Sequence, residues 1–195
     1  MNTTVRNKKV KLTARDWEQA ALALIADKGL NALAVEPLAR LMGITKGSFY
    51  WHFPNREALL TQALNHWEEH DARNLTRALS AIADPTERLR SFFRASSREV
   101  FTAEVFSSLV LAADHPQVEP VLERVASRRI KHLSQAFEQL GLDSEAAENR
   151  ARLSYSSYMG FLQLQRQRQA PSLSSEAFDA YVEHVIDTLI PEAPA

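Results

Sequence analysis

The residues best suited to contacting another molecule directly lie in one short stretch, 45–52. This stretch combines a lysine, hydroxyl side chains and three rings that can donate hydrogen bonds. Lysine neutralises a phosphate, whereas tyrosine and histidine donate hydrogen bonds to phosphate oxygens. Serine and tryptophan can contact base edges or thymine methyl groups. The candidate DNA-binding residues are therefore Thr45, Lys46, Gly47, Ser48, Tyr50, Trp51 and His52.

Two short helices, predicted at 35–42 and 46–52, position these side chains as a helix-turn-helix. Gly43 allows the backbone of the turn to take a positive φ, and Ile44 anchors the turn in the core. Phe49 and Phe53 lie four residues apart and are predicted to point inward. The second helix fits the major groove of DNA. The alternative is an ordinary surface helix with exposed aromatic side chains.

The remaining chain has helical periodicity, few glycines and no β-branched alternation, which predicts an all-α fold. Thr13 caps a helix over 13–28 that ends at Gly29, and Asn55 caps a long helix over 56–83. We expect a DNA-binding domain over 11–56 and a helical ligand-binding and dimerisation domain over 57–195. Further helices are predicted near 86–102, 104–113, 117–140, 144–169 and 174–190.

Charge is distributed unevenly along the chain. Residues 1–55 hold eight basic and four acidic side chains, 8 − 4 = +4, and residues 56–195 hold fifteen and twenty, 15 − 20 = −5. This pattern fits a small domain that binds a polyanion, although a solvated basic tail would give the same count. The chain has no cysteine, no apolar run of roughly 18 residues and no apolar core near its start. We therefore expect a cytoplasmic protein without a membrane partner.

Catalytic patterns are weak in this sequence. His66, Glu69 and His70 form H-x-x-E-H, which is found in inverted zinc proteases, but no later motif supplies a third ligand. A metal-dependent hydrolase is thus one alternative, against a chance match on a charged helix face. Gly-rich phosphate loops, G-x-S-x-G motifs and cysteine nucleophiles are absent, so we expect no enzyme and no cofactor. A second alternative is a helical adaptor that binds protein instead of DNA.

The stretch 13–60 resembles the DNA-binding head of the TetR (tetracycline repressor) family. One residue departs from the family pattern: Ala34 stands where a serine or threonine usually caps the second helix. The resemblance implies a homodimeric repressor that leaves an inverted-repeat operator when a small apolar or aromatic ligand binds. The matching residues are Ala20-Ala21, Gly29, Leu33, Leu38-Ala39, the unbroken block from Gly43 to Phe53, and Leu59-Leu60.

The resemblance also implies that the middle helices surround a ligand cavity and that the last two pair with a second copy. Simple core packing and a monomeric core are the alternatives for the same residues. The candidate ligand-binding residues are Trp67, Phe92, Phe93, Phe101, Phe106, Leu109, Val110, Tyr155, Tyr158 and Phe161. The candidate dimer residues are Met159, Leu162, Phe178, Tyr181, Val182, Val185, Ile186 and Leu189.

Overall fold

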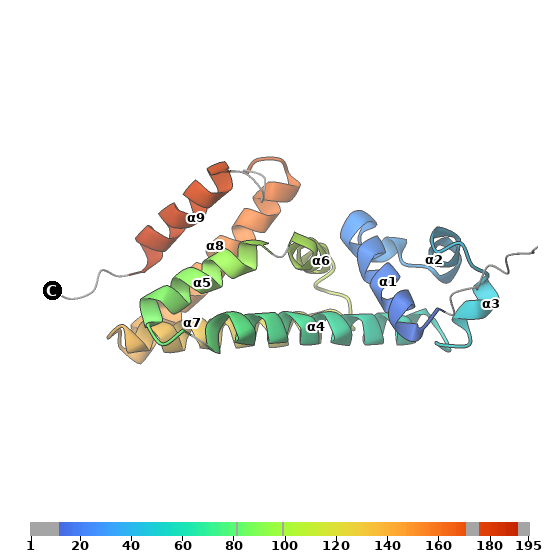
Figure 1. Cartoon of the computed structure of the whole chain (residues 1–195), viewed down its shortest axis with the longest axis horizontal. Coiled ribbons are helices and arrows are strands. Elements are labelled where there is room, and N and C mark those ends of the chain that lie inside the picture. Colours follow the sequence, from blue (N-terminus) through green and yellow to red (C-terminus); the bar gives the residue numbers. More distant parts are fainter. Residues whose placement is uncertain (1–11, 81, 99, 171–175, 191–195) are drawn as a thin grey trace, which may run out of the picture.

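The computed structural model describes residues 12–80, 82–98, 100–170 and 176–190, and all regular structure in these ranges is helical (Figure 1). The predicted all-α class is confirmed. One long helix, α4, runs from a small head of α1 to α3 into a body of α5 to α9 (Figure 1). The elements are α1 Ala14–Lys28, the 3-10 turn η1 Leu30–Ala32, α2 Val35–Leu41, α3 Lys46–Phe49, α4 Arg56–Ser80, α5 Pro85–Arg98, α6 Val100–Val110, α7 Glu119–Gln139, α8 Ser144–Arg166 and α9 Glu176–Leu189.

The first helix is fixed at both ends by local interactions. The Thr13 amide donates to Asp16 Oδ2 at 2.6 Å and the Asp16 amide donates to Thr13 Oγ1 at 3.4 Å, forming a capping box. The hydrogen bonds that the Thr13 amide and hydroxyl donate to the Asp16 carboxylate lower the pKa of Asp16. Gly29 ends the helix at φ 81°. The predicted caps of α1 are thus confirmed.

The core of the head is aromatic. Trp17 and Phe49 are fully buried and meet edge to face with ring centroids 5.3 Å apart, and Phe49 stacks on Phe53 at 5.6 Å. Gly43 has φ +68° and lies in the turn between α2 and α3, as the helix-turn-helix requires. The inward orientation of Phe49 and Phe53 is confirmed, because both are at most 1% exposed.

Several helix ends differ from the prediction by a few residues. The helix α3 ends at Phe49 instead of residue 52, because the amides of His52 and Phe53 both donate to the Phe49 carbonyl and close the chain into a turn. Thr45 precedes α3 with extended backbone but makes no side-chain capping bond. The helices α5 and α6 meet around residue 99, not 103, where no glycine or proline marks the break.

The long helix α4 belongs to both parts of the molecule. Asn55 Oδ1 accepts the Ala58 amide at 2.8 Å, so the predicted cap is confirmed. The buried face of α4 continues from Leu59 and Leu60 through Leu64 to Trp67. The predicted division into 11–56 and 57–195 falls in the first turn of α4, which begins at Arg56, and it stays a prediction. In the part of the chain that the structure describes, no helix is both long and apolar enough to span a membrane.

Ala34 offers a direct test of helix capping. It precedes α2 with extended backbone (φ −143°, ψ 150°) and makes no side-chain hydrogen bond to the helix. We expect Ala34→Ser to raise the free energy of unfolding by about 1 kcal/mol, because a serine hydroxyl can accept a first-turn amide. Urea unfolding would measure this. Ala23→Ser, at an exposed position inside α1, is the control and should not stabilise the protein.

Candidate nucleic-acid interface and interior cavity

The predicted DNA-binding residues surround α3, at the end of the molecule opposite α9 (Figure 1). Trp51 is 88% exposed and Tyr50 is 55% exposed, although both are large aromatic side chains. Thr45, Lys46 and Gly47 are also exposed, whereas Ser48 and His52 are half-buried. The structure therefore brings all seven residues together on one short segment, with the two aromatic side chains projecting beyond it.

This segment rests on a rigid base. The Phe49 ring meets the Tyr50 ring edge to face at 5.2 Å, which positions Tyr50 against the core. Arg56, which the sequence reasoning did not single out, donates from Nε to the Leu33 carbonyl at 2.6 Å and from Nη2 to the Leu30 carbonyl at 3.4 Å. Arg56 thereby ties the start of α4 to the segment before α2. Sequence reasoning could not find this role of Arg56, because its partners are backbone atoms 23 and 26 residues away.

The residues of the H-x-x-E-H pattern are engaged with different neighbours. His66 Nδ1 lies 3.0 Å from Glu18 Oε2 on α1, Glu69 pairs with Arg73 at 3.4 Å, and His70 hydrogen-bonds to Asn74 at 3.2 Å. Among the described residues, no group of three or more histidine or acidic side chains could hold a metal ion. The metal-dependent hydrolase is not supported, and His66 instead joins α4 to the head.

Residues 19–63 match the family model described as bacterial regulatory proteins, tetR family. Over this N-terminal region the chain has a domain of the TetR regulatory-protein type. The match covers α2, α3 and the turn between them, together with parts of α1 and α4. It therefore contains all seven predicted DNA-binding residues.

Curated relatives of the chain are HTH-type transcriptional regulators. It is 40% identical over 62 residues to the uncharacterized HTH-type transcriptional regulator YuxN of Bacillus subtilis, covering 32% of this chain and 20% of YuxN. It is 25% identical over 137 residues to the HTH-type transcriptional regulator LmrA of Bacillus subtilis, covering 68% of this chain and 73% of LmrA. It is 26% identical over 117 residues to the HTH-type transcriptional repressor KstR2 of Mycolicibacterium smegmatis, covering 60% of this chain and 51% of KstR2. The chain thus spans about half or less of the length of two of these relatives.

Solved structures share the whole fold. A TetR transcriptional regulator from Legionella pneumophila aligns with a TM-score of 0.75 at 22% identity, covering 97% of this chain and 100% of that one. The ketosteroid transcriptional regulator KstR2 of Mycobacterium tuberculosis aligns with a TM-score of 0.67 at 20% identity, covering 94% and 98%. The helical body of this chain therefore shares its fold with these regulators, as the head does.

An aromatic layer crosses the interior of the body. The Trp67 ring stacks on Phe106 with centroids 6.1 Å apart, and Phe106 stacks on Tyr158 at 6.2 Å. The guanidinium carbon of Arg129 lies 5.0 Å from the Phe106 centroid and 5.4 Å from that of Tyr158. Three predicted ligand-binding residues thus meet around an arginine that the sequence reasoning missed. Nothing in the charged run around Arg129 distinguishes this arginine from its exposed neighbours.

A small apolar cavity of about 30 Å³ lies beside this layer, between α5, α8 and α9. Three of its lining residues, Phe93, Tyr158 and Phe161, belong to the predicted ligand set. The Phe161 ring also contacts the rings of Phe178 at 5.0 Å and Tyr181 at 4.9 Å. The rest of the lining consists of Ser157 and four residues predicted for the dimer, which are Phe178, Tyr181, Val182 and Val185.

The other predicted ligand-binding residues do not line this cavity. Phe101 is 46% exposed, because the start of α6 turns its side chain outward. Phe92 is buried against the edge of Phe93, with centroids 5.8 Å apart. Leu109 is fully buried, and Val110 and Tyr155 are half-buried against the core.

Five predicted dimer residues are already buried within a single chain: Leu162 on α8, and Phe178, Val182, Ile186 and Leu189 on α9, which packs on α5. Arg94 strengthens this packing through a hydrogen bond to Glu183 at 2.8 Å. Met159, Tyr181 and Val185 are half-buried. The apolar side chains left exposed on α8 are Leu153, at 54%, and Leu164, at 45%, with the exposed Gly160 between them on the same helix face.

We expect the α3 segment to carry the affinity for DNA. Lys46→Ala and Tyr50→Ala should weaken binding to all sequences, and Lys46→Ala should lower the salt slope of binding by about 1. Trp51→Ala should cost about 1–3 kcal/mol and relax the preference among sequences. Fluorescence anisotropy with operator and random DNA at several salt concentrations would measure both effects.

Lys131→Ala is the matched control, because Lys131 is an exposed lysine on α7 in the body. The affinity of the Lys131→Ala variant for DNA and the salt slope of its binding should equal those of the unmodified protein. An unchanged affinity and salt slope in a folded Lys46→Ala, Tyr50→Ala double variant would contradict the assignment.

Proposed function

We propose that this chain is a cytoplasmic, sequence-specific DNA-binding repressor that acts as a homodimer and leaves an inverted-repeat operator when a small molecule binds its body. The observation that carries the proposal is the exposure of Trp51 and Tyr50 beside Lys46 and the amide of Gly47. Large aromatic side chains on a monomer surface mark an interaction site. The adjoining Lys46 side chain and Gly47 backbone amide favour a polyanion as the partner.

The dimer is supported by the exposed face of α8. Leu153, Gly160 and Leu164 are spaced by seven and four residues, so they form one stripe along the helix. A Cβ placed on Gly160 would meet no atom within 4 Å, so this position leaves open room for a partner helix to approach. Two heads related by a two-fold axis would read two half-sites about 34–36 Å apart.

A charge in this stripe should separate the copies. We expect the Leu153→Glu, Leu164→Glu double variant to weaken dimerisation by about 100-fold or more, because both carboxylates would be desolvated at the interface. Sedimentation at micromolar concentration would measure the change. Leu111→Glu is the matched control, since Leu111 is 64% exposed but lies after α6. A wild-type monomer under these conditions would refute the proposed dimer.

The ligand part of the proposal rests on the aromatic layer and the cavity beside it. KstR2 is a ketosteroid transcriptional regulator, and a flat apolar ligand of that general kind would suit stacked aromatic side chains. The cavity of about 30 Å³ has room for only about two water molecules. A ligand must therefore move helices of the body to enter, so ligand binding changes the positions of these helices.

Two connections carry such a movement to the head. The first is α4, whose Trp67 reaches the aromatic layer and whose Arg56 holds the head. The second runs through Ser108 of α6, which is 1% exposed. Its hydroxyl accepts from Arg166 Nη1 of α8 at 2.9 Å and donates to the Ala26 carbonyl of α1 at 3.2 Å. A shift of α8 is thereby linked to α1 by two consecutive hydrogen bonds.

Ser108→Ala should uncouple the ligand from DNA. We expect the factor by which an inducer weakens operator binding to fall toward 1, from a typical coupling of about 1–3 kcal/mol. An inducer found by thermal-shift screening, titrated with and without operator, would give this factor for each variant. Ser107→Ala is the control: Ser107 is equally buried, and its hydroxyl has no hydrogen-bond partner among the described residues. An unchanged factor in Ser108→Ala would exclude this route.

A further inference from the structure

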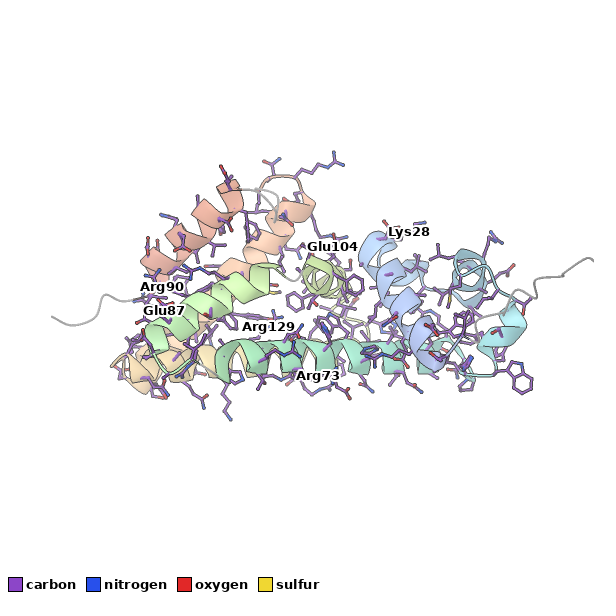
Figure 2. All side chains as sticks on the ribbon, viewed as in Figure 1. Lys28, Arg73, Glu87, Arg90, Glu104 and Arg129 are labelled. Atoms are coloured by element: carbon purple, nitrogen blue, oxygen red, sulfur yellow. The ribbon has the colours of Figure 1, made fainter. Side chains whose placement is uncertain are left out.

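Arg129 is a buried cation in the interior of the body, between α4 and the helices that pack over it (Figure 2). It is 4% exposed, and its Nη2 donates to Asp71 Oδ1 at 2.5 Å. Burying a guanidinium carries a large desolvation penalty, which an ion pair offsets only when the remaining protons are also hydrogen-bonded. Arg129 does not meet that condition, because its Nη1 has no hydrogen-bond partner among the described residues.

A second buried donor beside Arg129 is in the same state. Trp67 is 2% exposed, and the structure pairs its Nε1 with no acceptor in the described part of the chain. Both groups flank the Phe106 ring, with the Trp67 centroid at 6.1 Å and the Arg129 guanidinium carbon at 5.0 Å. Buried donors without acceptors are rare in native proteins. The layer around Phe106 therefore contains two unpaired hydrogen-bond donors, Arg129 Nη1 and Trp67 Nε1, that could bind the acceptor atoms of a ligand.

The charges in the ion pairs between α7 and α4 do not cancel, and the further carboxylate of Glu123 acts on the half-exposed Arg124. Glu68 accepts from Arg124 at 2.6 Å and from Arg128 at 2.7 Å, so it is fully engaged by these two arginines. Asp71 Oδ2 has no hydrogen-bond partner and lies 4.0 Å from Arg128 Nη1. Three guanidinium groups thus face two carboxylates, 3 − 2 = +1. One negative charge would neutralise the cluster, whereas a doubly charged phosphate monoester would reverse its sign.

The neighbouring titratable groups preserve this excess at neutral pH. Burial, with the nearby Arg128 and Lys131, lowers the pKa of His132, so this histidine adds no positive charge. Burial raises the pKa of Tyr155 to about 12 and also raises that of Tyr158. Both hydroxyls therefore stay protonated, and that of Tyr158 is also hydrogen-bonded to Arg129.

The charged cluster adjoins the apolar cavity. The Tyr158 ring lies 5.4 Å from the Arg129 guanidinium carbon and also lines the cavity, together with Phe93 and Phe161. A molecule that reaches both regions needs an apolar part for the cavity and a singly charged acceptor group for Arg129. We propose that the ligand of this protein is an apolar or aromatic monocarboxylate whose carboxylate binds Arg129. This inference rests on the proposed function, since it names the class of the inducer.

Matched pairs of carboxylates and primary amides test the proposal. The probes are 2-naphthoate, 4-phenylbutyrate and decanoate, each titrated calorimetrically beside its amide into the full-length protein. We expect at least one carboxylate to bind about 10-fold or more tightly than its amide, because only the anion forms a charge-assisted hydrogen bond. If no carboxylate binds more tightly than its amide, the proposal is overturned.

Variants of the Arg129–Asp71 ion pair show whether Arg129 binds the ligand or only stabilises the fold. Arg129→Gln should remove the preference for the carboxylate, and Asp71→Asn should increase it, because it deletes the competing negative charge. A purely structural ion pair would make both variants lose ligand affinity together, which would also overturn the proposal. Asp71→Asn with Arg129→Gln forms a neutral, hydrogen-bonding pair, so the preference can be measured even if Arg129→Gln alone does not fold.

Arg73→Gln is the control for the loss of one arginine. Arg73 lies on α4 two residues from Asp71, but its side chain is 54% exposed and pairs with Glu69. Figure 2 shows it on α4. The Arg73→Gln variant should keep the preference for the carboxylate. A loss of this preference equal to that in Arg129→Gln would count against the proposed site. Anisotropy with random DNA on the same samples separates the proposed ligand class from the proposed function. If the protein binds DNA but shows no preference for carboxylates, only the ligand class is rejected.

Discussion

The long helix α4 has to satisfy two cores at once, and the arrangement of the other helices follows from that requirement. Its first turns bury Leu59 and Leu60 against the head, and its later turns bury Trp67 and Asp71 in the body. A helix transmits displacement along its length because its backbone hydrogen bonds are continuous. No flexible linker therefore separates the helix-turn-helix from the interior of the body, and a change in one must be accommodated by the other.

Polar contacts fix the position of α4 on both sides. His66 meets Glu18 of the head at 3.0 Å, while Glu68 and Asp71 meet three arginines of α7. Buried ion pairs add little net stability, because desolvation offsets much of the Coulombic attraction. Their geometry is demanding, however, so they favour one packing of α4 over neighbouring ones. A ligand that competes for Arg129 would weaken this preference and let α4 shift.

The surface around α3 exposes apolar area to water, which is unfavourable for the free protein. Trp51 leaves 88% of its surface in water although tryptophan has one of the largest apolar side chains. Folding gains little from such a residue, so its exposure is best understood from a bound partner. The aromatic core beneath it, where Trp17 contacts Phe49, holds the segment rigid. Binding then requires little ordering of the backbone, which conserves affinity.

The sequence by itself determined the local features of this protein. Caps such as Thr13 and Asn55, the positive φ of Gly43 and the inward spacing of Phe49 and Phe53 depend on residues within a few positions of one another, so a pattern can show them. The exposure of the segment predicted to bind DNA followed for the same reason. Its end at Phe49 did not, because the choice between helix and turn near Pro54 depends on how two amides share one carbonyl.

Only the tertiary structure decided which side chains meet across the body. Arg129 is one of several arginines on α7, and it is buried because α4, α6 and α8 converge on it; no local pattern encodes that convergence. The apolar stripe of α9 fits a partner chain or its own core equally well, and the packing of α9 on α5 assigned Ile186 and Leu189 to the core. Periodicity gives the faces of a helix, whereas the neighbour of each face depends on contacts between residues far apart in the chain.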